Sequence, residues 1–260
     1  MLSLQGRFIH SQTGLIDNIG NPFLNSLLVF YNMNESSGTR VDAVGSGHDL
    51  NEIQGTVSAD TGIISNAISI AGNAAIGRLN GPGPLTTANL GTANGFTITA
   101  WVFPTSLLVA RTFMALHQDS DPASQGSATF SFLLQTNSSD ATKVRFIVSN
   151  ISGGTIQLDS ATATMTENAW NFVVGWYDPV ADLAHVQVNL GAIADGVYTG
   201  GIAVSATHNL TYSKNSILDL GVGNQWVGKI DASGVWGRQL TASERATLYN
   251  SGAGKEHPFN

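Results

Sequence analysis

Short apolar segments with a period of two constrain the fold of this chain more than any other feature. In FTITAWVFP, residues 96–104, the side chains of Phe96, Ile98, Ala100 and Val102 fall on one face. Strict alternation of this kind predicts a β-strand with one face in a core. Further segments with the same strand pattern are 27–31, 128–136, 143–149, 171–178 and 183–190.

Turns rich in Gly, Asn and Asp separate these segments, and no helical pattern is interleaved with them. Many short strands joined in this way indicate an all-β fold of two antiparallel sheets packed face to face, because each sheet then buries its apolar face against the other. The sequence shows no repeat of about 20–50 residues, which disfavours a propeller or a solenoid.

One helix is predicted near the C-terminus, in LTASERATLYNSG, residues 240–252. Thr241 fits the N-cap and Glu244 follows it by three residues, which is the pattern of a capping box. A weak apolar stripe runs to Leu248, and Gly252 can take the left-handed conformation that ends a helix. Since such a helix cannot join a sheet, we expect it to cover an edge or an open end of the sandwich.

The charge of the chain is sparse and acidic. Of its 260 residues 11% are charged, the formal net charge is −7, and the lysines are scattered: Lys143, Lys214, Lys229 and Lys255. Nucleic-acid binding needs clustered basic side chains, so it is disfavoured. The absence of cysteine excludes disulfides, thiolate metal sites and cysteine nucleophiles. The longest apolar runs are too short to form a membrane span.

The first 25 residues show no clean periodicity, and we interpret 1–25 as an N-terminal arm that precedes a single domain, residues 26–260. An arm of this kind is either a disordered terminus or a segment that attaches to a neighbouring protein. Its sequence lacks the basic start and the uninterrupted apolar stretch of a secretion signal. We therefore expect the chain to be made in the cytoplasm without a signal peptide.

Four segments carry a family resemblance. They are an opening strand with its Asp-Gly loop at 27–50, a central strand at 95–104, a Trp-led strand pair at 168–189, and a closing run at 218–254 with Leu-x-Leu-Gly, Gly-x-Ile-Asp and Arg-x-Leu-Thr before the helix. In this order they resemble the concanavalin A-like, laminin G-like jelly-roll family, over residues 26–254. The resemblance implies a two-sheet jelly-roll sandwich. That family contains glycan-binding lectins, adhesion modules, glycoside hydrolases and proteins of viral particles, so the fold alone does not choose a function.

The hydrolases of this family need two carboxylates on one sheet face, in the commonest branch as Glu-x-Asp-x-x-Glu. The five glutamates, none of which has Asp two places later, are Glu35, Glu52, Glu167, Glu244 and Glu256. Asp178 and Asp182 fall in a hairpin turn, where Asp bonds the backbone. No serine lies in a Gly-x-Ser-x-Gly elbow. We predict that the protein is not an enzyme.

Ca²⁺ is the metal that the resemblance implies, because relatives hold it with loop oxygens. The matching positions are Asp42, in the opening loop, and Asp231, in KIDASG. The first and last strands of a jelly roll can be neighbours, which would bring the two carboxylates together. The alternative, which we favour, is that both aspartates bond backbone amides in turns.

A glycan site needs an exposed aromatic ring with amide groups beside it. Trp226 is the candidate ring, since it falls in a turn next to Asn224 and Gln225, whose amides bond hydroxyls. The alternative is that Trp226 folds back onto the end of the sandwich. The remaining tryptophans, which we assign to the core, are Trp101, Trp170, Trp176 and Trp236.

The leading functional hypothesis is a non-catalytic structural or display protein of a phage-like particle, such as a capsid decoration or tail protein with glycan adhesion. A virion component is made in the host cytoplasm and works outside the cell, which reconciles the missing signal with a family that acts outside cells. We expect a homo-oligomer that binds a capsid or tail protein through its arm. The alternatives are an extracellular or cell-surface lectin module and, less favoured, a glycoside hydrolase.

Overall fold

The structure is a computed structural model of the whole chain. It describes residues 21–54, 57–71, 78–80, 90, 95–117, 130–149, 155–161, 164–198, 209–213 and 225–259.

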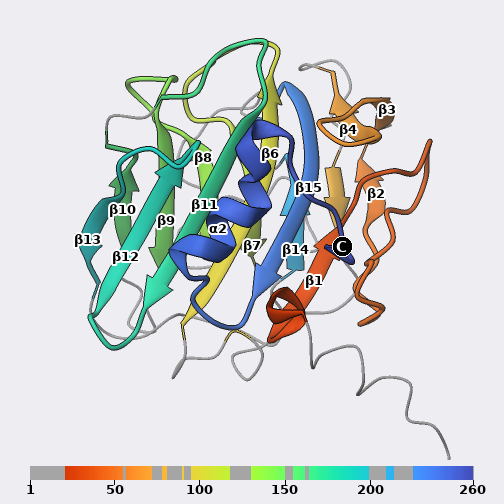
Figure 1. Cartoon of the computed structure of the whole chain (residues 1–260). Coiled ribbons are helices and arrows are strands. Elements are labelled where there is room, and N and C mark those ends of the chain that lie inside the picture. The colour runs from red at the N-terminus through yellow and green to blue at the C-terminus, as the bar shows by residue number, and fades with distance from the viewer. Residues whose placement is uncertain are drawn as a thin grey trace, which may run out of the picture.

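In the described part of the chain, one antiparallel sheet has eight strands (Figure 1). Seven of them follow one another across the sheet: β13 (Ala194–Val197), β12 (Leu183–Val188), β11 (Asn171–Asp178), β6 (Phe96–Pro104), β15 (Gly228–Trp236), β4 (Asn66–Ile70) and β3 (Ser58–Thr61). The eighth, β1 (Leu27–Tyr31), pairs with β15.

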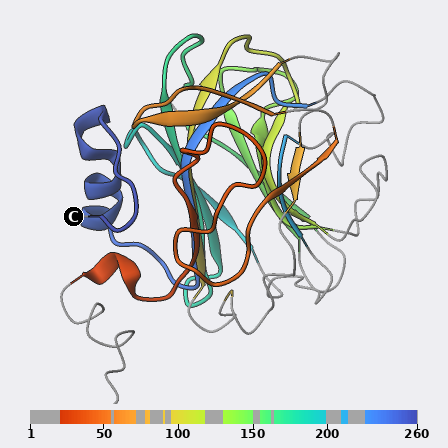
Figure 2. The same ribbon diagram turned by 90° about the vertical axis from the view of Figure 1, so that its right-hand side faces the viewer.

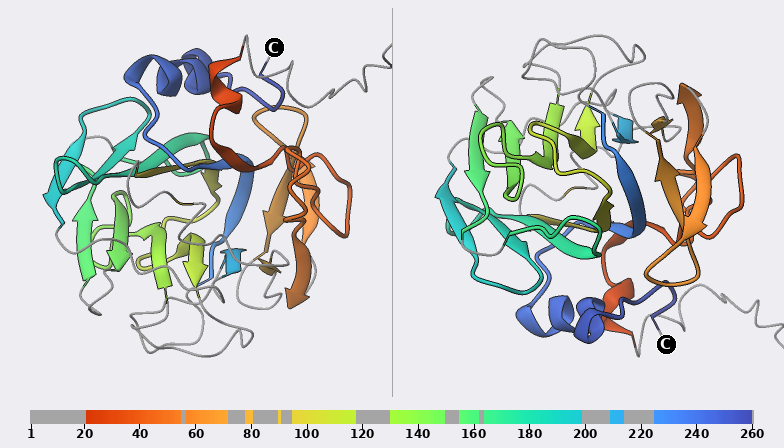
Figure 3. Two further views of the ribbon diagram at one scale, coloured as in Figure 1. Left: turned by 90° about the horizontal axis from the view of Figure 1, so that it is seen from below. Right: turned by 90° about the horizontal axis from the view of Figure 1, so that it is seen from above.

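The second antiparallel sheet has seven strands among the described residues. Their order is β10 (Thr155–Asp159), β9 (Val144–Ser149), β8 (Phe130–Thr136), β7 (Thr112–His117), β14 (Asn209–Tyr212), β5 (Arg78–Asn80) and β2 (Asn51–Gln54). Seen along the strands, the two sheets lie one above the other, as a sandwich (Figure 3). The predicted all-β fold of two packed antiparallel sheets is confirmed.

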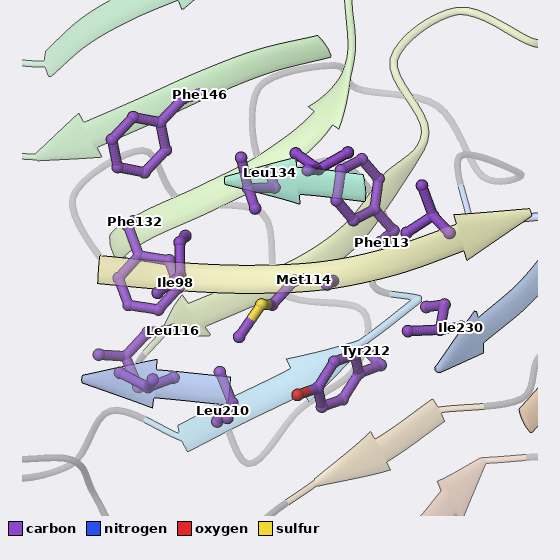
Figure 4. Close-up of a cluster of buried hydrophobic side chains, with 14 of the residues drawn as sticks. Ile98, Phe113, Met114, Leu116, Phe132, Leu134, Phe146, Leu210, Tyr212 and Ile230 are labelled. Carbon is purple, nitrogen blue, oxygen red and sulfur yellow. The ribbon is translucent and has the colours of Figure 1, made fainter. Parts of the chain in front are cut away.

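The main core fills the space between the sheets (Figure 4). The predicted inward face of β6 is confirmed, because Phe96, Ile98, Ala100 and Val102 are all fully buried in it. Phe96 stacks on Phe132 of the opposite sheet with ring centroids 5.4 Å apart. Burial of each large apolar side chain stabilises the fold by about 1.5–3 kcal/mol, so this layer is the main source of stability.

Strand β15 changes its neighbour halfway along its length. Its first half pairs with β4 and its second half with β1, on the same side. A register irregularity between Asp231 and Gly234 marks the change, and Ala232 has a positive φ there. Such a bulge bends one strand and re-aims its side chains. The first and last strands are therefore neighbours, the arrangement that a shared site of Asp42 and Asp231 would require.

The C-terminal helix α2 (Ala242–Tyr249) lies against the outer face of the eight-stranded sheet, in front of β6 and β11 (Figures 1 and 2). We expected it over an edge or an open end, and that was wrong. The reason is that the outer face carries large apolar residues that need cover: Phe30, Trp101, Phe172, Trp176 and Trp236. Tyr249 stacks on Trp101, with ring centroids 5.6 Å apart, and Leu248 joins the same cluster.

The helix begins as predicted and ends earlier. Thr241 accepts the Glu244 amide, and the Glu244 carboxylate accepts the Thr241 amide, which completes the capping box. The helix ends at Tyr249 because Asn250 already takes the left-handed conformation, two residues before Gly252, and Asn tolerates that conformation better than most residues. Arg238 adds two bonds to the Glu244 carboxylate, at 2.6 and 2.9 Å.

The predicted arm lies outside the described residues except for its last five. A 3-10 helix, η1 (Pro22–Leu24), packs beside α2 on the outer face. Phe23 belongs to the outer cluster, and its carbonyl accepts the indole N–H of Trp236 at 2.8 Å. Contacts of the domain thus extend back at least to Phe23.

Replacing the helix cap tests the attachment of α2. We expect Thr241→Ala to lower the free energy of unfolding by about 1 kcal/mol, because the backbone amide of Glu244 in the first turn loses its acceptor, the Thr241 hydroxyl. Urea unfolding measures this change. Ser243→Ala, at an exposed position in the same turn, is the control and should change stability by less than about 0.5 kcal/mol. Equal effects of the two substitutions would contradict the assigned cap.

Candidate functional site

The carboxylate of Asp42 closes the loop after β1. It accepts the amides of Phe30 at 3.3 Å, Val44 at 3.1 Å and Ser46 at 2.9 Å, and also the Ser46 hydroxyl. Asp42 is almost fully buried. Its oxygens are therefore used by backbone and hydroxyl donors, as in the turn-capping alternative.

The carboxylate of Asp231 ties β15 to the β3–β4 turn. Its Oδ2 accepts the amides of Ile63 at 2.8 Å and Ile64 at 3.2 Å, and its Oδ1 accepts the amide of Ala232 at 2.7 Å. Asp231 is fully buried. Burial raises its pKa to about 7, and the nearby Glu256 carboxylate adds to the rise, while the three amides oppose it.

The two aspartates do not fit a Ca²⁺ ion. Calcium takes six to eight oxygen ligands, whereas each of these carboxylates faces N–H donors whose positive ends repel a cation. Across the described ranges, no group of three or more His, Asp or Glu side chains is placed to hold a metal ion. Asp42 accepts the amide of Phe30 on β1, and β1 pairs with β15, the strand of Asp231. Each carboxylate nevertheless holds a different loop: Asp42 the loop after β1, and Asp231 the β3–β4 turn.

Two of the predicted glycan residues, Gln225 and Trp226, lie just before β15 begins. Trp226 is only 1% exposed, and its ring packs edge-on against Phe113, 5.3 Å between centroids. Gln225 is also buried, and Asn224 lies outside the described residues. A ring enclosed in this way offers no face to a sugar. The alternative reading, in which Trp226 folds back onto the sandwich, describes the structure.

In the part of the chain that the structure describes, the acidic residues weighed as a catalytic pair have structural roles. Asp178 accepts the amides of Val180 and Ala181 in the hairpin turn, as predicted. Glu244 is the helix cap. The Glu256 carboxylate lies close enough to add to the raised pKa of Asp231, but Asp231 is fully buried and already accepts three amides, so it cannot reach a substrate.

The candidate site is instead a row of side chains on the outer face of the eight-stranded sheet. Lys229 pairs with Phe103 on one side and with Ser69 on the other, and Ser69 pairs with Ser58. Directly paired residues of antiparallel strands project to the same face. Trp170 completes the row. The next residue, Asn171, pairs with Val102 of β6, so Trp170 lies opposite Phe103, and the centroids of the Trp170 and Phe103 rings are 5.4 Å apart with an interplanar angle of 64°. We call these five residues the outer strip.

Every member of the outer strip is partly or fully accessible. Ser58 is exposed, and Trp170, Phe103, Lys229 and Ser69 are half-buried. On β6, Trp101 precedes Phe103 by two residues and points to the same face, but it is buried under Tyr249 of α2. The helix thus covers the neighbouring row and leaves two aromatic rings beside an ammonium and two hydroxyls. Aromatic faces with a few polar groups beside them are the usual composition of a small-molecule site.

Lys229 is held in place from three directions. Its Nζ contacts Asp60 Oδ1 at 2.9 Å, donates to the Thr61 carbonyl at 3.3 Å, and lies 5.2 Å from the centre of the Phe103 ring. The hydrogen bond from Lys229, followed by that from the Thr61 amide, lowers the pKa of Asp60 below its usual range. Asp60 therefore stays ionised in weakly acidic solution.

Sequence reasoning missed this site because we assigned Trp170 to the core as the first residue of a strand. A signal was present in the alternation itself. In FTITAWVFP the inward residues have even numbers, so Phe103 points to the outer face. In GKIDASG, Lys229 precedes the apolar Ile230 and therefore also points outward if Ile230 points into the core. What the pattern does not contain is which outward residues the helix covers.

Comparison with known families matches residues 80–244, more than half of the chain, to the family model described as the concanavalin A-like lectin/glucanases superfamily. No curated protein matches the sequence. In the described part of the chain no helix is long and apolar enough to cross a membrane.

Solved structures share the fold at low sequence identity. The binding domain of Paraclostridial Mosquitocidal Protein 1 aligns with a TM-score of 0.63 and 13% identity, over 87% of this chain and 52% of its own. Domain 4 of AbnA, an extracellular GH43 arabinanase from Geobacillus stearothermophilus, in complex with arabinotriose, gives 0.55 and 15%, over 85% and 96%. The binding domain of Botulinum Neurotoxin DC in complex with SialylT gives 0.58 and 14%, over 88% and 52%. This chain thus spans about half the length of the two toxin binding domains.

The raised pKa of Asp231 predicts a specific pH dependence of stability. Between about pH 4 and pH 7 the native state keeps a proton that the unfolded state releases, so the contribution of Asp231 to the unfolding free energy falls as pH rises, by up to about 4 kcal/mol. Asp231→Asn cannot ionise. We expect its stability relative to the parent to increase from pH 5 to pH 8 in urea unfolding.

The control for this measurement is Asp182→Asn, which changes an exposed aspartate of the β11–β12 turn. Its stability relative to the parent should vary little over the same pH range. A difference between Asp231→Asn and the parent that is constant with pH would show that burial does not perturb this carboxylate.

The amide bonds of Asp42 and Asp231 predict the response to Ca²⁺. We expect millimolar Ca²⁺ to leave the melting temperature of the parent unchanged, because both carboxylates are already saturated with donors. A calcium-induced rise that Asp42→Asn or Asp231→Asn abolishes would refute this prediction and restore the metal site.

Proposed function

The chain belongs to the concanavalin A-like lectin/glucanase superfamily, and from this premise we propose that it is a non-catalytic carbohydrate-binding jelly-roll domain. The observation that carries the proposal is the outer strip, where Trp170 and Phe103 remain partly exposed while the aromatic rows beside them are covered by α2.

The chemistry of the strip suits a sugar. The C–H face of a pyranose or furanose ring packs on an aromatic ring, and its hydroxyls need donors and acceptors at the ring's edge. Trp170 supplies the aromatic face, because the face of Phe103 already carries the Lys229 ammonium. Lys229, Asp60 and the serine hydroxyls supply the polar partners.

Structural neighbours add support at the level of the fold. One of them is a domain of an arabinanase bound to arabinotriose, and it covers nearly the same length as this chain. The toxin neighbours are binding domains, and one of them is in complex with SialylT. A binding role therefore agrees with both the fold and the strip.

The role in a phage-like particle, the capsid or tail partner and the homo-oligomer stay predictions from the sequence. They are compatible with glycan binding, because a display subunit that adheres to a surface needs an accessible sugar site.

A binding assay with one aromatic replacement tests the proposed function. We expect the parent to bind at least one member of a glycan array, and Trp170→Ala to weaken that binding at least tenfold, because truncation of a Trp at the centre of a binding surface typically costs about 2 kcal/mol or more. Isothermal titration calorimetry with the best-bound glycan gives the dissociation constants.

Val180→Ala is the matched control. Val180 is the most exposed of the large apolar side chains described, and it lies in the hairpin at the far end of β11 from Trp170. Its replacement should leave affinity unchanged. A parent that binds no carbohydrate would overturn the proposed function, and equal binding by Trp170→Ala would move it away from the outer strip.

A further inference from the structure

The ion pair at the centre of the outer strip has the geometry to discriminate between ligands. The bonds that Asp60 accepts from Lys229 and from the Thr61 amide both end on Oδ1, at 2.9 and 2.6 Å. The side chain of Asp60 is 44% exposed, so Oδ2 is the oxygen left to accept from a ligand. Lys229 has three N–H donors, of which two reach Asp60 and the Thr61 carbonyl.

We infer that the outer strip takes a neutral saccharide in preference to an acidic one, and that Lys229 and Asp60 are the selecting pair. This inference rests on the proposed function and adds the substrate class. A neutral sugar with adjacent hydroxyls can donate to Asp60 Oδ2, accept from Lys229 Nζ and stack on Trp170 at once.

An acidic sugar gains little from the same groups. The only cation of the strip is Lys229, and its charge is already balanced by Asp60 at 2.9 Å. A ligand carboxylate near the pair is attracted by Lys229 and repelled by Asp60 to a similar extent. It must also be desolvated to pack beside the two aromatic rings, which costs free energy. The net charge of −7 on the whole chain adds a weak repulsion that salt screens.

The position of the pair is fixed by the backbone rather than by chance contact of long side chains. Asp60 and Thr61 end β3, and the turn that follows is held to β15 by the amide bonds of Ile63 and Ile64 to Asp231. Lys229 stands two residues before Asp231 on the same strand. The selecting pair is therefore attached at both ends to one rigid junction.

The test uses matched neutral and acidic oligosaccharides of the same length and linkage, such as a hexose trisaccharide and the corresponding uronic acid trisaccharide, chosen from the glycan array series that the parent binds best. We expect the parent to bind the neutral member at least about fivefold more tightly, because the paired charges give a carboxylate no net attraction.

Two substitutions should change this ratio in opposite directions. Asp60→Asn frees the Lys229 charge and should raise affinity for the acidic member at least about fivefold, while affinity for the neutral member falls by about threefold or less. Lys229→Met leaves Asp60 unpaired and should weaken the acidic member further than the neutral one. Asp195→Asn, an exposed aspartate of β13 on the same sheet, changes the net charge equally and should leave the ratio unchanged.

The outcomes separate the two claims. If no saccharide binds the parent, the proposed function fails. If saccharides bind but the acidic member is equal or better, or if Asp60→Asn and Asp195→Asn give the same ratio, the proposed function stands and the inferred selectivity is overturned.

Discussion

The carboxylate of Asp231 accepts three backbone amides at the point where β15 exchanges β4 for β1. Two of these amides belong to the β3–β4 turn, so one buried side chain joins the bulge of the last strand to a hairpin far away in sequence. Gly62 stands in that turn because a Cβ there would clash with Asp231 Oδ2 and with the Asn66 carbonyl. The hairpin in turn supplies Asp60 and the Thr61 carbonyl, which place Lys229. The outer strip therefore depends on a buried interaction beneath it.

The second constraint is the surplus of aromatic side chains on the outer face of the eight-stranded sheet. A sandwich needs apolar residues only on its inner faces, yet Trp101, Phe172, Trp176 and Trp236 point outward and are buried. Helix α2 covers the first three, with Tyr249 on Trp101 and Phe172 and the Arg245 guanidinium over the Trp176 ring at 4.3 Å. Trp236 is covered instead by η1 and by Phe259 near the C-terminus. Since an eight-residue helix covers only part of a sheet, the aromatic row of Phe103 and Trp170 lies beyond it. An accessible aromatic surface thus follows from the length of the helix.

Alternation in the sequence predicted the sandwich, its antiparallel strands and the inward face of β6, because a period of two fixes which side chains share a face. The helix cap was also predictable, because the capping box depends only on Thr241 and Glu244, three residues apart in the sequence. The position of the helix was not, since it depends on the outward tryptophans of several strands. The predicted glycan site was wrong for a similar reason. The local sequence indicates an exposed turn at Trp226, but Phe113, more than one hundred positions earlier, packs against its ring.

The central claim is that sugars bind at Trp170, on the outer face beside α2, and not at Trp226. The five tryptophans give separate indole N–H resonances when the protein is labelled with ¹⁵N, and a titration with the best-bound neutral saccharide reports where it lies. We predict that the Trp170 indole resonance moves progressively to saturation while that of the buried Trp226 stays in place. Movement of the Trp226 resonance with Trp170 unchanged would contradict the account.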